Sequence, residues 1–286
     1  MKLILGTVQM GINYGINNSL GKISTEESHH ILFKAFSNGI TTLDTAEVYG
    51  NAHQVIGLFH KKYPDNKFNI VTKVPHNIEA NSIEIKVRKY LKDLDVNCID
   101  VLMFHSFDSY KRHQGSFIKL LELRSKGLIN HIGVSVYTNE QLEYLLDKDY
   151  IEVVQLPFNL LDNYSVRGDL LVELKLKKKI IHTRSAFLQG LFFKETSEET
   201  NIIKKLSPEL EILNQIVIQS KCSMEELALS YCLCQKSIDN VIIGVDSVDQ
   251  LIANLIAASY KIENDVIKKI NSLKIKDLDL LNPSLW

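Results

Sequence analysis

The sequence contains few cysteines and prolines and almost no excess of charge, and each shortage excludes a class of protein. The four cysteines, Cys98, Cys222, Cys232 and Cys234, lack the paired spacing of a zinc site, and we interpret them as small buried residues in a reducing compartment. Lysine and arginine total 33 against 34 acidic residues, and a net charge of -1 argues against a nucleic-acid binder. No linker rich in proline, glycine or serine divides the 286 residues.

Long apolar runs are also missing. No stretch of about 18 apolar residues occurs, so we expect no membrane-spanning helix. The start, Met1 to Thr7, has one positive charge and too short an apolar stretch for a signal peptide, and we expect a cytoplasmic protein. The glycine-rich phosphate loops GxGxxG and GxxxxGKS are absent, which argues against an open doubly wound sheet, the main alternative for an α/β chain.

Short apolar runs alternate with longer helical patterns along the chain. A mostly apolar run of four to eight residues without clean alternation is typical of a strand buried on both faces. The expected strands are residues 39–44, 68–74, 99–105, 131–136, 151–158, 180–184 and 240–245. The expected helices include residues 82–94, 115–126, 139–146, 202–219, 225–235 and 248–258. This repetition predicts a parallel sheet closed into a single (β/α)8 TIM barrel over residues 1–286.

Only seven strands are evident in this pattern. We expect the missing one near residues 220–222, between two helices, as a short or degenerate strand. The segment Gly6 to Gly11 precedes Asn13-Tyr14-Gly15, and we interpret the latter as a turn before the first helix.

Polar side chains stand where three consecutive strands end. Asp44 ends one strand, Lys73 ends the next and His105 the third, while Tyr49 follows Asp44 in the first loop. Each alone has an ordinary explanation, such as a helix cap, a solvent-facing lysine or a packed histidine. Because active sites of barrels lie at the C-terminal ends of the strands, the four together indicate one catalytic site.

The four residue types suit the addition of hydride to a carbonyl group. Lys73, held by Asp44, would place a cation beside the Tyr49 hydroxyl and so lower the pKa of the phenol. Tyr49 would then protonate the carbonyl oxygen as a general acid, and His105 would donate a hydrogen bond to the same oxygen. No side chain supplies hydride, so a nicotinamide cofactor is required.

These motifs resemble those of the aldo-keto reductase superfamily. The stretch Leu43-Asp44-Thr45-Ala46-Glu47-Val48-Tyr49-Gly50 carries the resemblance, with Thr72-Lys73 and Phe104-His105 in support, in the family's order along nearly the whole chain. The resemblance implies a (β/α)8 barrel, NAD(P)H bound across its rim, and an Asp-Tyr-Lys-His tetrad formed by Asp44, Tyr49, Lys73 and His105. It implies a small carbonyl compound as substrate.

The resemblance also implies contacts to the cofactor. Ser135 and Gln155 match residues that hold the carboxamide, although Val136 stands where the family has an asparagine. Arg184 stands where many members stack an aromatic ring on the nicotinamide, and Ser185 to Gly190 resembles the loop around the pyrophosphate. The full set of expected cofactor contacts is Thr7, Asp44, Ser135, Gln155, Arg184, Ser185, Leu188, Gly190, Gly244, Val245, Gln250 and Asn254.

The adenosine-binding segment departs from the pattern of NADP-specific members. Where those members commonly place a lysine and an arginine for the 2′-phosphate, this chain has Gly244 and Gln250, and it adds Asp246. A carboxylate near a 2′-phosphate is unfavourable, whereas it suits a free ribose. We therefore expect a weakened preference for NADP, with NAD as an alternative cofactor.

The sequence says less about the substrate. The polar residues expected near the mouth suit a hydroxylated compound, and they are Asn13, Tyr14, His53, Asn159 and Arg184. The stretch from Gly6 to Gly21 resembles bacterial members found with surface-polysaccharide genes, which suggests a sugar-type carbonyl. The tail ends in the only tryptophan, Trp286, which either packs on the barrel or caps the pocket. We expect a monomer or a weak homo-oligomer.

Two other functions are compatible with a barrel of this kind. One is a non-catalytic barrel that binds the cofactor as a sensor or regulatory subunit, although a sensor has no need of Tyr49. The other is a metal-dependent hydrolase built on Asp44, His105 and His182. Lys73 between these ligands would repel a dication, so we expect no metal.

Overall fold

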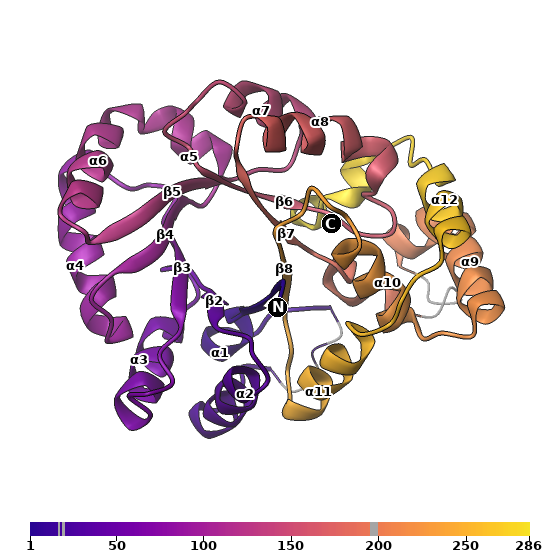
Figure 1. Cartoon of the computed structure of the whole chain (residues 1–286), viewed down its shortest axis with the longest axis horizontal. Coiled ribbons are helices and arrows are strands. Elements are labelled where there is room, and N and C mark those ends of the chain that lie inside the picture. Colours follow the sequence, from indigo (N-terminus) through magenta and orange to yellow (C-terminus); the bar gives the residue numbers. More distant parts are fainter. Residues whose placement is uncertain (17, 19–20, 195–199) are drawn as a thin grey trace.

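The strands of the chain form a closed parallel barrel surrounded by helices. The computed structural model describes residues 1–16, 18, 21–194 and 200–286. In this part of the chain the strands are β1 (Leu3–Gly6), β2 (Thr42–Asp44), β3 (Asn69–Val74), β4 (Ile99–Phe104), β5 (Ile129–Ser135), β6 (Val153–Pro157), β7 (Ile180–Arg184) and β8 (Asn240–Ile243). Each pairs with its neighbour in sequence, and β8 pairs with β1 (Figure 1). The prediction of a (β/α)8 barrel is confirmed, and an open sheet is excluded.

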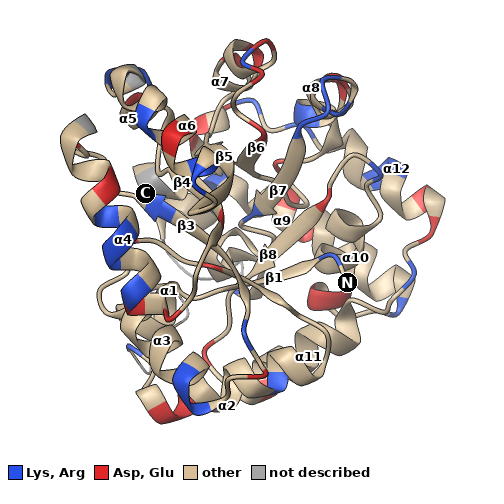
Figure 2. Cartoon of the chain, turned by 60° about the vertical axis from the view of Figure 1, so that its left-hand side comes forward, with Lys and Arg blue, Asp and Glu red and all other residues tan. Residues whose placement is uncertain are grey.

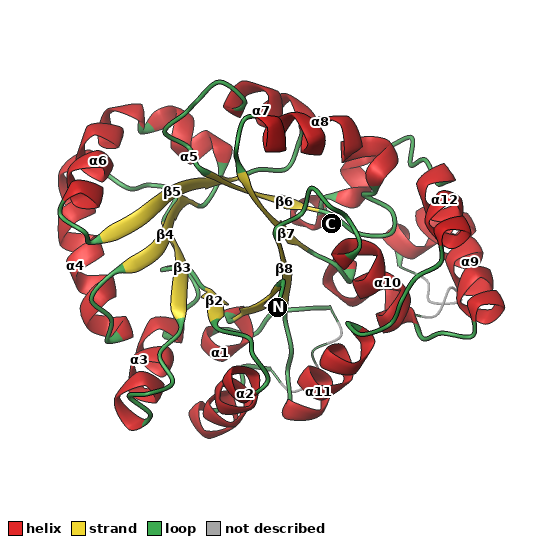
Figure 3. Cartoon of the chain, in the orientation of Figure 1, coloured by secondary structure: helices red, strands yellow, loops and turns green. Residues whose placement is uncertain are grey.

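An outer ring of helices covers the barrel (Figure 3). The helices are α1 (Val8–Gly11), α2 (Thr25–Ser37), α3 (Ala52–Lys62), α4 (Ile83–Leu94), α5 (Phe107–Arg112), α6 (Phe117–Ser125), α7 (Asn139–Leu145), α8 (Tyr164–Leu176), α9 (Asn201–Ser220), α10 (Met224–Leu233), α11 (Val248–Ala257) and α12 (Asn264–Ser272). Charged residues of both signs are spread over these helices, as the near-zero net charge implies (Figure 2). No helix in the described residues is long and apolar enough to cross a membrane.

The prediction of a strand near residues 220–222 is wrong. The chain there ends α9 with Lys221 in the left-handed conformation, and the Ser223 side chain then caps α10. The strand that completes the barrel is β1, whose Leu3 pairs with Val241. Its four residues lie ahead of every run that we assigned and end at Gly6. The short helix α1 lies between β1 and Asn13-Tyr14-Gly15, so that segment follows the first helix and does not precede it.

Two apolar layers hold the barrel together. The larger lies between strands and helices, and α4 shows its origin: Ile83, Val87, Tyr90 and Leu94 recur every three or four residues and are all buried. The smaller fills the barrel interior with Val71, Val101, Met103 and Val153. Because side chains alternate along a strand, Val71 and Lys73 of β3 share the interior face. The Lys73 side chain therefore points into the barrel, next to this apolar cluster and nearer the C-terminal ends of the strands.

Three of the four cysteines differ from the expectation of buried residues. Cys232 is buried as predicted, but Cys234 is exposed, and Cys98 and Cys222 are partly exposed. Cys234 directly follows Leu233, the last residue of α10.

Candidate active site

A buried ion pair lies at the C-terminal end of the strands. The Lys73 Nζ is 2.6 Å from Asp44 Oδ1 and also donates to the Thr45 carbonyl at 3.1 Å. The Gln155 amide donates to the other Asp44 oxygen at 2.7 Å. Burial lowers the pKa of Lys73, and the Asp44 carboxylate opposes that shift. Pairing thus lets both charges remain in a site almost closed to water.

Tyr49 lies next to this pair. Its ring centroid is 5.6 Å from the Lys73 Nζ and 5.8 Å from the ring of His105, which it meets edge to face. The structure therefore brings together all four residues predicted from the strand ends.

A close backbone contact fixes the turn that carries Tyr49. A Cβ added to Gly11 would lie 1.7 Å from the Tyr49 carbonyl oxygen. Gly50 has a φ of +57°, and a Cβ there would lie 2.4 Å from the Gly11 carbonyl oxygen. Only glycine fits at both positions, so α1 packs directly on the backbone that presents the phenol.

The pKa of Tyr49 differs from the expectation. Burial raises it far above its usual value, the Asp44 carboxylate raises it further, and the positive charge of Arg184 only partly offsets these effects. The prediction that Lys73 would lower this pKa is wrong, because Asp44 lies against the Lys73 ammonium and balances its charge. Tyr49 consequently carries its proton at neutral pH.

His105 is held as a neutral imidazole. Burial, with further contributions from Lys73 and His76, lowers its pKa to about 3. Its ring stacks on His76 with centroids 5.0 Å apart, and His76 is in turn hydrogen-bonded to the Ser106 hydroxyl at 3.0 Å. The His105 Nδ1 is buried and has no hydrogen-bond partner within the described part of the chain. Its ring is therefore oriented by stacking and keeps hydrogen-bonding capacity for a ligand.

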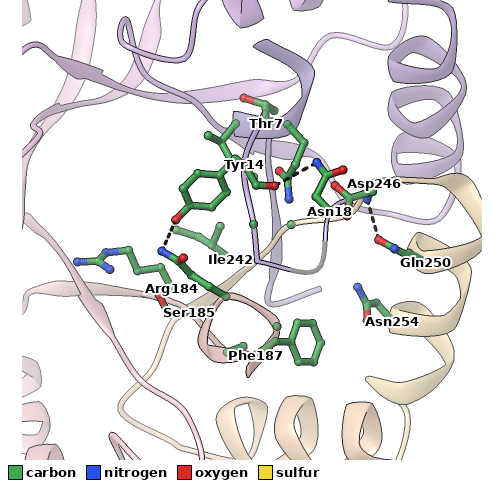
Figure 4. A pocket seen from close by; sticks show the side chains of 18 of the residues that line it. Thr7, Tyr14, Asn18, Arg184, Ser185, Phe187, Ile242, Asp246, Gln250 and Asn254 are labelled. Atoms are coloured by element: carbon green, nitrogen blue, oxygen red, sulfur yellow. Dashed lines mark hydrogen bonds between the residues drawn. The ribbon is translucent and has the colours of Figure 1, made fainter. Parts of the chain in front are cut away.

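A cavity of about 490 Å³ extends from Tyr49 and Asp44 to α11. This volume is within the range of cofactor sites, roughly 300–1,000 Å³. Figure 4 shows Arg184 and Asn254 on opposite sides of the view, with the loop carrying Phe187 between them. The loop after β7 folds into η3 (Leu188–Phe193), where Gln189 and Gly190 have left-handed backbone angles. The cavity thus extends from the strand ends to α11, and the segments after β1, β7 and β8 border it.

Most of the expected cofactor contacts line this cavity. They are Thr7, Asp44, Gln155, Arg184, Ser185, Gly190, Gly244, Gln250 and Asn254. Ser135, Leu188 and Val245 are not among the described lining residues, and all three side chains are buried. Leu188 and Val245 belong to the apolar core, so their side chains support the loops that border the cavity.

Of the five polar residues predicted at the mouth, two line the cavity. Tyr14 and Arg184 line the cavity, where the Gln189 amide donates to the Tyr14 hydroxyl at 2.9 Å. Arg184 lies 4.1 Å over the Tyr137 ring and donates to the Val136 carbonyl at 3.2 Å.

The other three residues predicted at the mouth have structural roles or point elsewhere. His53 is buried against Thr72, with Nε2 and Oγ1 2.8 Å apart. Asn159 accepts hydrogen bonds from the backbone of a buried turn, and Asn13 is exposed outside the lining. Their positions near the strand ends do not reveal which way the side chains face.

The C-terminal tail packs on the barrel. Leu281 is buried in the apolar core, whereas Trp286 is 40% exposed and donates its indole N–H to the Leu280 carbonyl at 3.1 Å. Trp286 is not among the described residues that line the cavity, so it does not cap this pocket.

Several lining residues escaped the sequence analysis. They are Val8, Gln9, Gly15, Asn18, Phe193 and Glu225, whereas Phe187 and Gln189 lie within the loop at residues 185–190 already assigned to the cofactor, and Ile242 and Ala253 lie within the adenosine-binding segment. A signal was present for Phe193, which comes shortly after that loop. Glu225 belongs to the first turn of α10, and nothing in the sequence indicates that this turn faces the cavity.

The metal-dependent alternative has no support in the geometry. Asp44 lies against the Lys73 ammonium, and burial lowers the pKa of His182 to about 4. Within the described ranges, no three His, Cys, Asp or Glu side chains are grouped as metal ligands would be.

Comparison with known proteins identifies relatives over most of the chain. The model of the Aldo/keto reductase family matches residues 2–275. L-galactose dehydrogenase of Arabidopsis thaliana is 24% identical over 264 residues, which is 85% of this chain and 82% of that protein. NADH-specific methylglyoxal reductase of Escherichia coli is 22% identical over 272 residues, 82% of this chain and 83% of that protein.

Solved structures support the same fold. The holo form of the aldo-keto reductase AKR11C1 from Bacillus halodurans superposes with a TM-score of 0.78, covering 96% of this chain and 93% of that one at 20% identity. The apo form of the same protein gives a TM-score of 0.73 at 20% identity, covering 93% and 92%.

Proposed function

Because the chain belongs to the aldo/keto reductase family, it is an NAD(P)H-dependent oxidoreductase that acts on small carbonyl compounds, and we propose that Asp44, Tyr49, Lys73 and His105 perform its chemistry. One observation carries this proposal. A protonated phenol lines a cavity of about 490 Å³, beside a buried Lys–Asp pair and a neutral imidazole. Family membership favours this enzyme over a non-catalytic sensor. We further propose that it works as a monomer or weak homo-oligomer in the cytoplasm.

The cavity suits a dinucleotide in its volume and in its unpaired polar atoms. Gln9 Oε1 and Asp246 Oδ1 are buried without partners in the described structure. A Cβ on Gly244 would lie 2.8 Å from Gln9 Nε2, so glycine leaves room for the Gln9 side chain at this end. We propose that Thr7, Gln155, Arg184 and Ser185 hold the nicotinamide half and that Gln250 and Asn254 hold the adenosine half. Ser135, Leu188 and Val245 complete the contacts, the last two through their backbone.

In the proposed reduction, Tyr49 acts as the proton donor. The bound NAD(P)H supplies the hydride that the carbonyl carbon receives. Tyr49 gives its phenolic proton to the carbonyl oxygen as negative charge develops there, which avoids a free alkoxide. His105 donates a hydrogen bond to the same oxygen and so orients the carbonyl group. Lys73 stabilises the phenolate that remains on Tyr49, and Asp44 holds the ammonium in place.

We propose a hydroxylated, sugar-like carbonyl compound as the substrate class. Tyr14 and Arg184 bring a hydroxyl and a guanidinium to the cavity near Tyr49, and L-galactose dehydrogenase is among the relatives. Polar side chains that lose water without finding a partner cost binding energy, so an apolar aldehyde should fit poorly.

A panel of paired substrates tests this class. We expect glyceraldehyde to give a kcat/KM at least tenfold above that of propanal, and galactose to exceed hexanal likewise, in the oxidation of NADH or NADPH followed at 340 nm. Equal values within each pair would contradict the substrate class and leave the catalytic residues unaffected.

We propose that the chain has a weakened preference for NADPH and accepts NADH as an alternative cofactor. Among the described residues lining the cavity Arg184 is the only basic one, and Asp246 and Glu225 lie in the same lining as Gln250 and Asn254. Asp246 is partly buried, and burial raises the pKa of its carboxyl, with a hydrogen bond involving Gln250 opposing the shift. A 2′-phosphate at this end would meet like charge.

The substitution Asp246→Ser tests the cofactor preference. We expect it to shift the ratio of Kd values for NADH and NADPH about tenfold toward NADPH, equivalent to about 1.4 kcal/mol, because the like charge is removed. Titration of the purified protein with each cofactor measures this without turnover. Asp249→Ser, which removes an exposed carboxylate of α11 outside the cavity, should leave the ratio unchanged. A thousandfold preference of the unmodified chain for NADPH would reject the proposal.

A further inference from the structure

The turn that carries Tyr49 is held by Glu47, which lies two residues earlier in the chain. The Glu47 backbone N–H donates to the Lys73 carbonyl at 3.2 Å, which ties residues 45–51 to β3. The Glu47 side chain extends from this turn to α4. There it accepts hydrogen bonds from the Lys86 ammonium at 2.5 Å and from the Tyr90 hydroxyl. We call Glu47, Lys86 and Tyr90 the Glu47 clamp.

Tyr90 anchors the clamp in the protein interior, whereas the Lys86 and Glu47 side chains are 28% and 31% exposed. Tyr90 is 1% exposed and belongs to the apolar core through its ring, so its hydroxyl has little freedom to move. The buried ring of His53, from α3, packs edge-on against it with centroids 5.1 Å apart. His53 also bonds the Thr72 hydroxyl at 2.8 Å, and Thr72 directly precedes Lys73. The clamp therefore links the turn to α3, α4 and β3.

The charged groups of the Glu47 clamp are paired with each other. Burial opposes ionisation of Glu47, but the hydrogen bonds from Lys86 and Tyr90 outweigh it and hold the pKa of the carboxyl below its usual range. Burial lowers the pKa of His53 to about 4, so this ring is neutral beside them. Charge-assisted hydrogen bonds are stronger and more directional than neutral ones. The carboxylate thus fixes the direction in which the turn leaves β2.

None of the three clamp residues is among the described residues that line the cavity, and the Glu47 carboxylate is instead bonded to Lys86 and Tyr90 of α4. The clamp is attached two residues away from the phenol, so it would act on a reaction at Tyr49 through the turn. A misplacement of a reacting group by about 1 Å can cost about 100-fold in rate.

We propose that Glu47 is a positioning residue that, through its bonds to Tyr90 and Lys86, aims the Tyr49 hydroxyl at the carbonyl oxygen. The inference rests on the proposed role of Tyr49 as proton donor. It adds a residue that holds Tyr49 in position from outside the cavity, through contacts with α4, the helix that follows β3.

The variant Tyr90→Phe tests the clamp with little change of volume. We expect kcat with glyceraldehyde to fall about tenfold, with KM and the Kd for NADH both within twofold of the unmodified chain. The solvent deuterium isotope effect on kcat should rise, because proton donation from a misaimed phenol becomes slower. Glu47→Ala should lower kcat about 100-fold, and adding Tyr90→Phe to it should cause no further loss, since both act through the same carboxylate.

Tyr231→Phe is the matched control. Tyr231 is also a fully buried tyrosine whose hydroxyl is hydrogen-bonded, to Asn271 at 2.6 Å, but it lies on α10 outside the clamp. We expect this variant to lose thermal stability comparably, with kcat and the isotope effect unchanged.

The outcomes distinguish a failure of the positioning role of the clamp from a failure of the proposed function. If Tyr49→Phe abolishes turnover while Tyr90→Phe lowers only the melting temperature, the clamp is structural and the inference is overturned. If Tyr90→Phe raises KM or Kd as much as it lowers kcat, the positioning role is also overturned. If Tyr49→Phe retains full kcat, the proposed function itself fails. Should Glu47→Ala not fold, Tyr90→Phe alone decides the question.

Discussion

Replacing Tyr49 with phenylalanine is expected to lower kcat for carbonyl reduction about 1,000-fold, within the range of about 10²–10⁴ that a general acid contributes. The ring, with its edge-to-face contact to His105, is retained, and only the transferable proton is lost. The Kd for NADH should change less than twofold, because the phenol is not needed to hold the cofactor. Stopped-flow or steady-state assays at 340 nm give kcat, and a fluorescence titration gives Kd.

Tyr164→Phe on the outer helix α8 is the control for this experiment and should retain full activity. A Tyr49→Phe variant that keeps more than a tenth of kcat would show that another group supplies the proton. A parallel loss of cofactor binding would show that the phenol holds the dinucleotide and is not the acid.

The same site predicts a flat pH profile for reduction. Burial raises the pKa of Tyr49 far above neutrality, and burial lowers that of His105 to about 3. Tyr49 stays protonated below its raised pKa, and His105 stays neutral above its lowered one, so neither changes charge between pH 5 and 8. A titration of kcat with a midpoint near 6 or 7 that disappears in His105→Asn would contradict this assignment.

Replacing Lys73 with methionine is expected to destabilise the fold as well as abolish activity. The variant leaves the Asp44 carboxylate, itself 5% exposed, without its cation. Removing one partner of a buried pair typically costs about 3–5 kcal/mol. A chain of this size loses about 2–4 °C of melting temperature per kcal/mol, so we expect Tm to fall by roughly 6–20 °C in a circular-dichroism melt.

A second substitution separates the unpaired charge from the lost packing. In Lys73→Met/Asp44→Asn the amide keeps an oxygen that accepts from Gln155, and no charge remains buried. We expect this double variant to recover more than half of the lost Tm while remaining inactive. A Lys73→Met variant that melts within 2 °C of the unmodified chain would show that the pair contributes little to stability.

The sequence reveals the catalytic residues because the fold brings them together by a simple rule. Asp44, Lys73 and His105 follow three consecutive strands, and parallel strands in a barrel all end at one rim. Tyr49 comes with Asp44 in the same short motif. Their identity and meeting place could therefore be predicted without coordinates.

The electrostatics of the site could not be predicted in this way. The sequence shows that Lys73 is near Tyr49, but the pKa of the phenol depends on how deeply it is buried and on which oxygen the ammonium faces. Both favour the protonated form here, against the expectation. The sequence also does not show which way the side chains of His53 and Asn159 point. Both residues lie near the rim, but their side chains form hydrogen bonds to other parts of the protein. Strand β1 escaped notice because only the four-residue helix α1 follows it, so the alternation of a short apolar run with a long helical pattern is absent there.

The pairing of β1 with β8 affects how the polypeptide folds as it leaves the ribosome. Leu3 emerges early but pairs with Val241, which is made near the end of the chain. At roughly 5–20 residues per second, translation leaves the outer edge of β1 without its final neighbour for tens of seconds. An open strand edge invites pairing with other chains. Closure of the barrel therefore has to wait until β8 has been synthesised, and until then we expect the open edge of β1 to be a place where the nascent chain can pair with other chains.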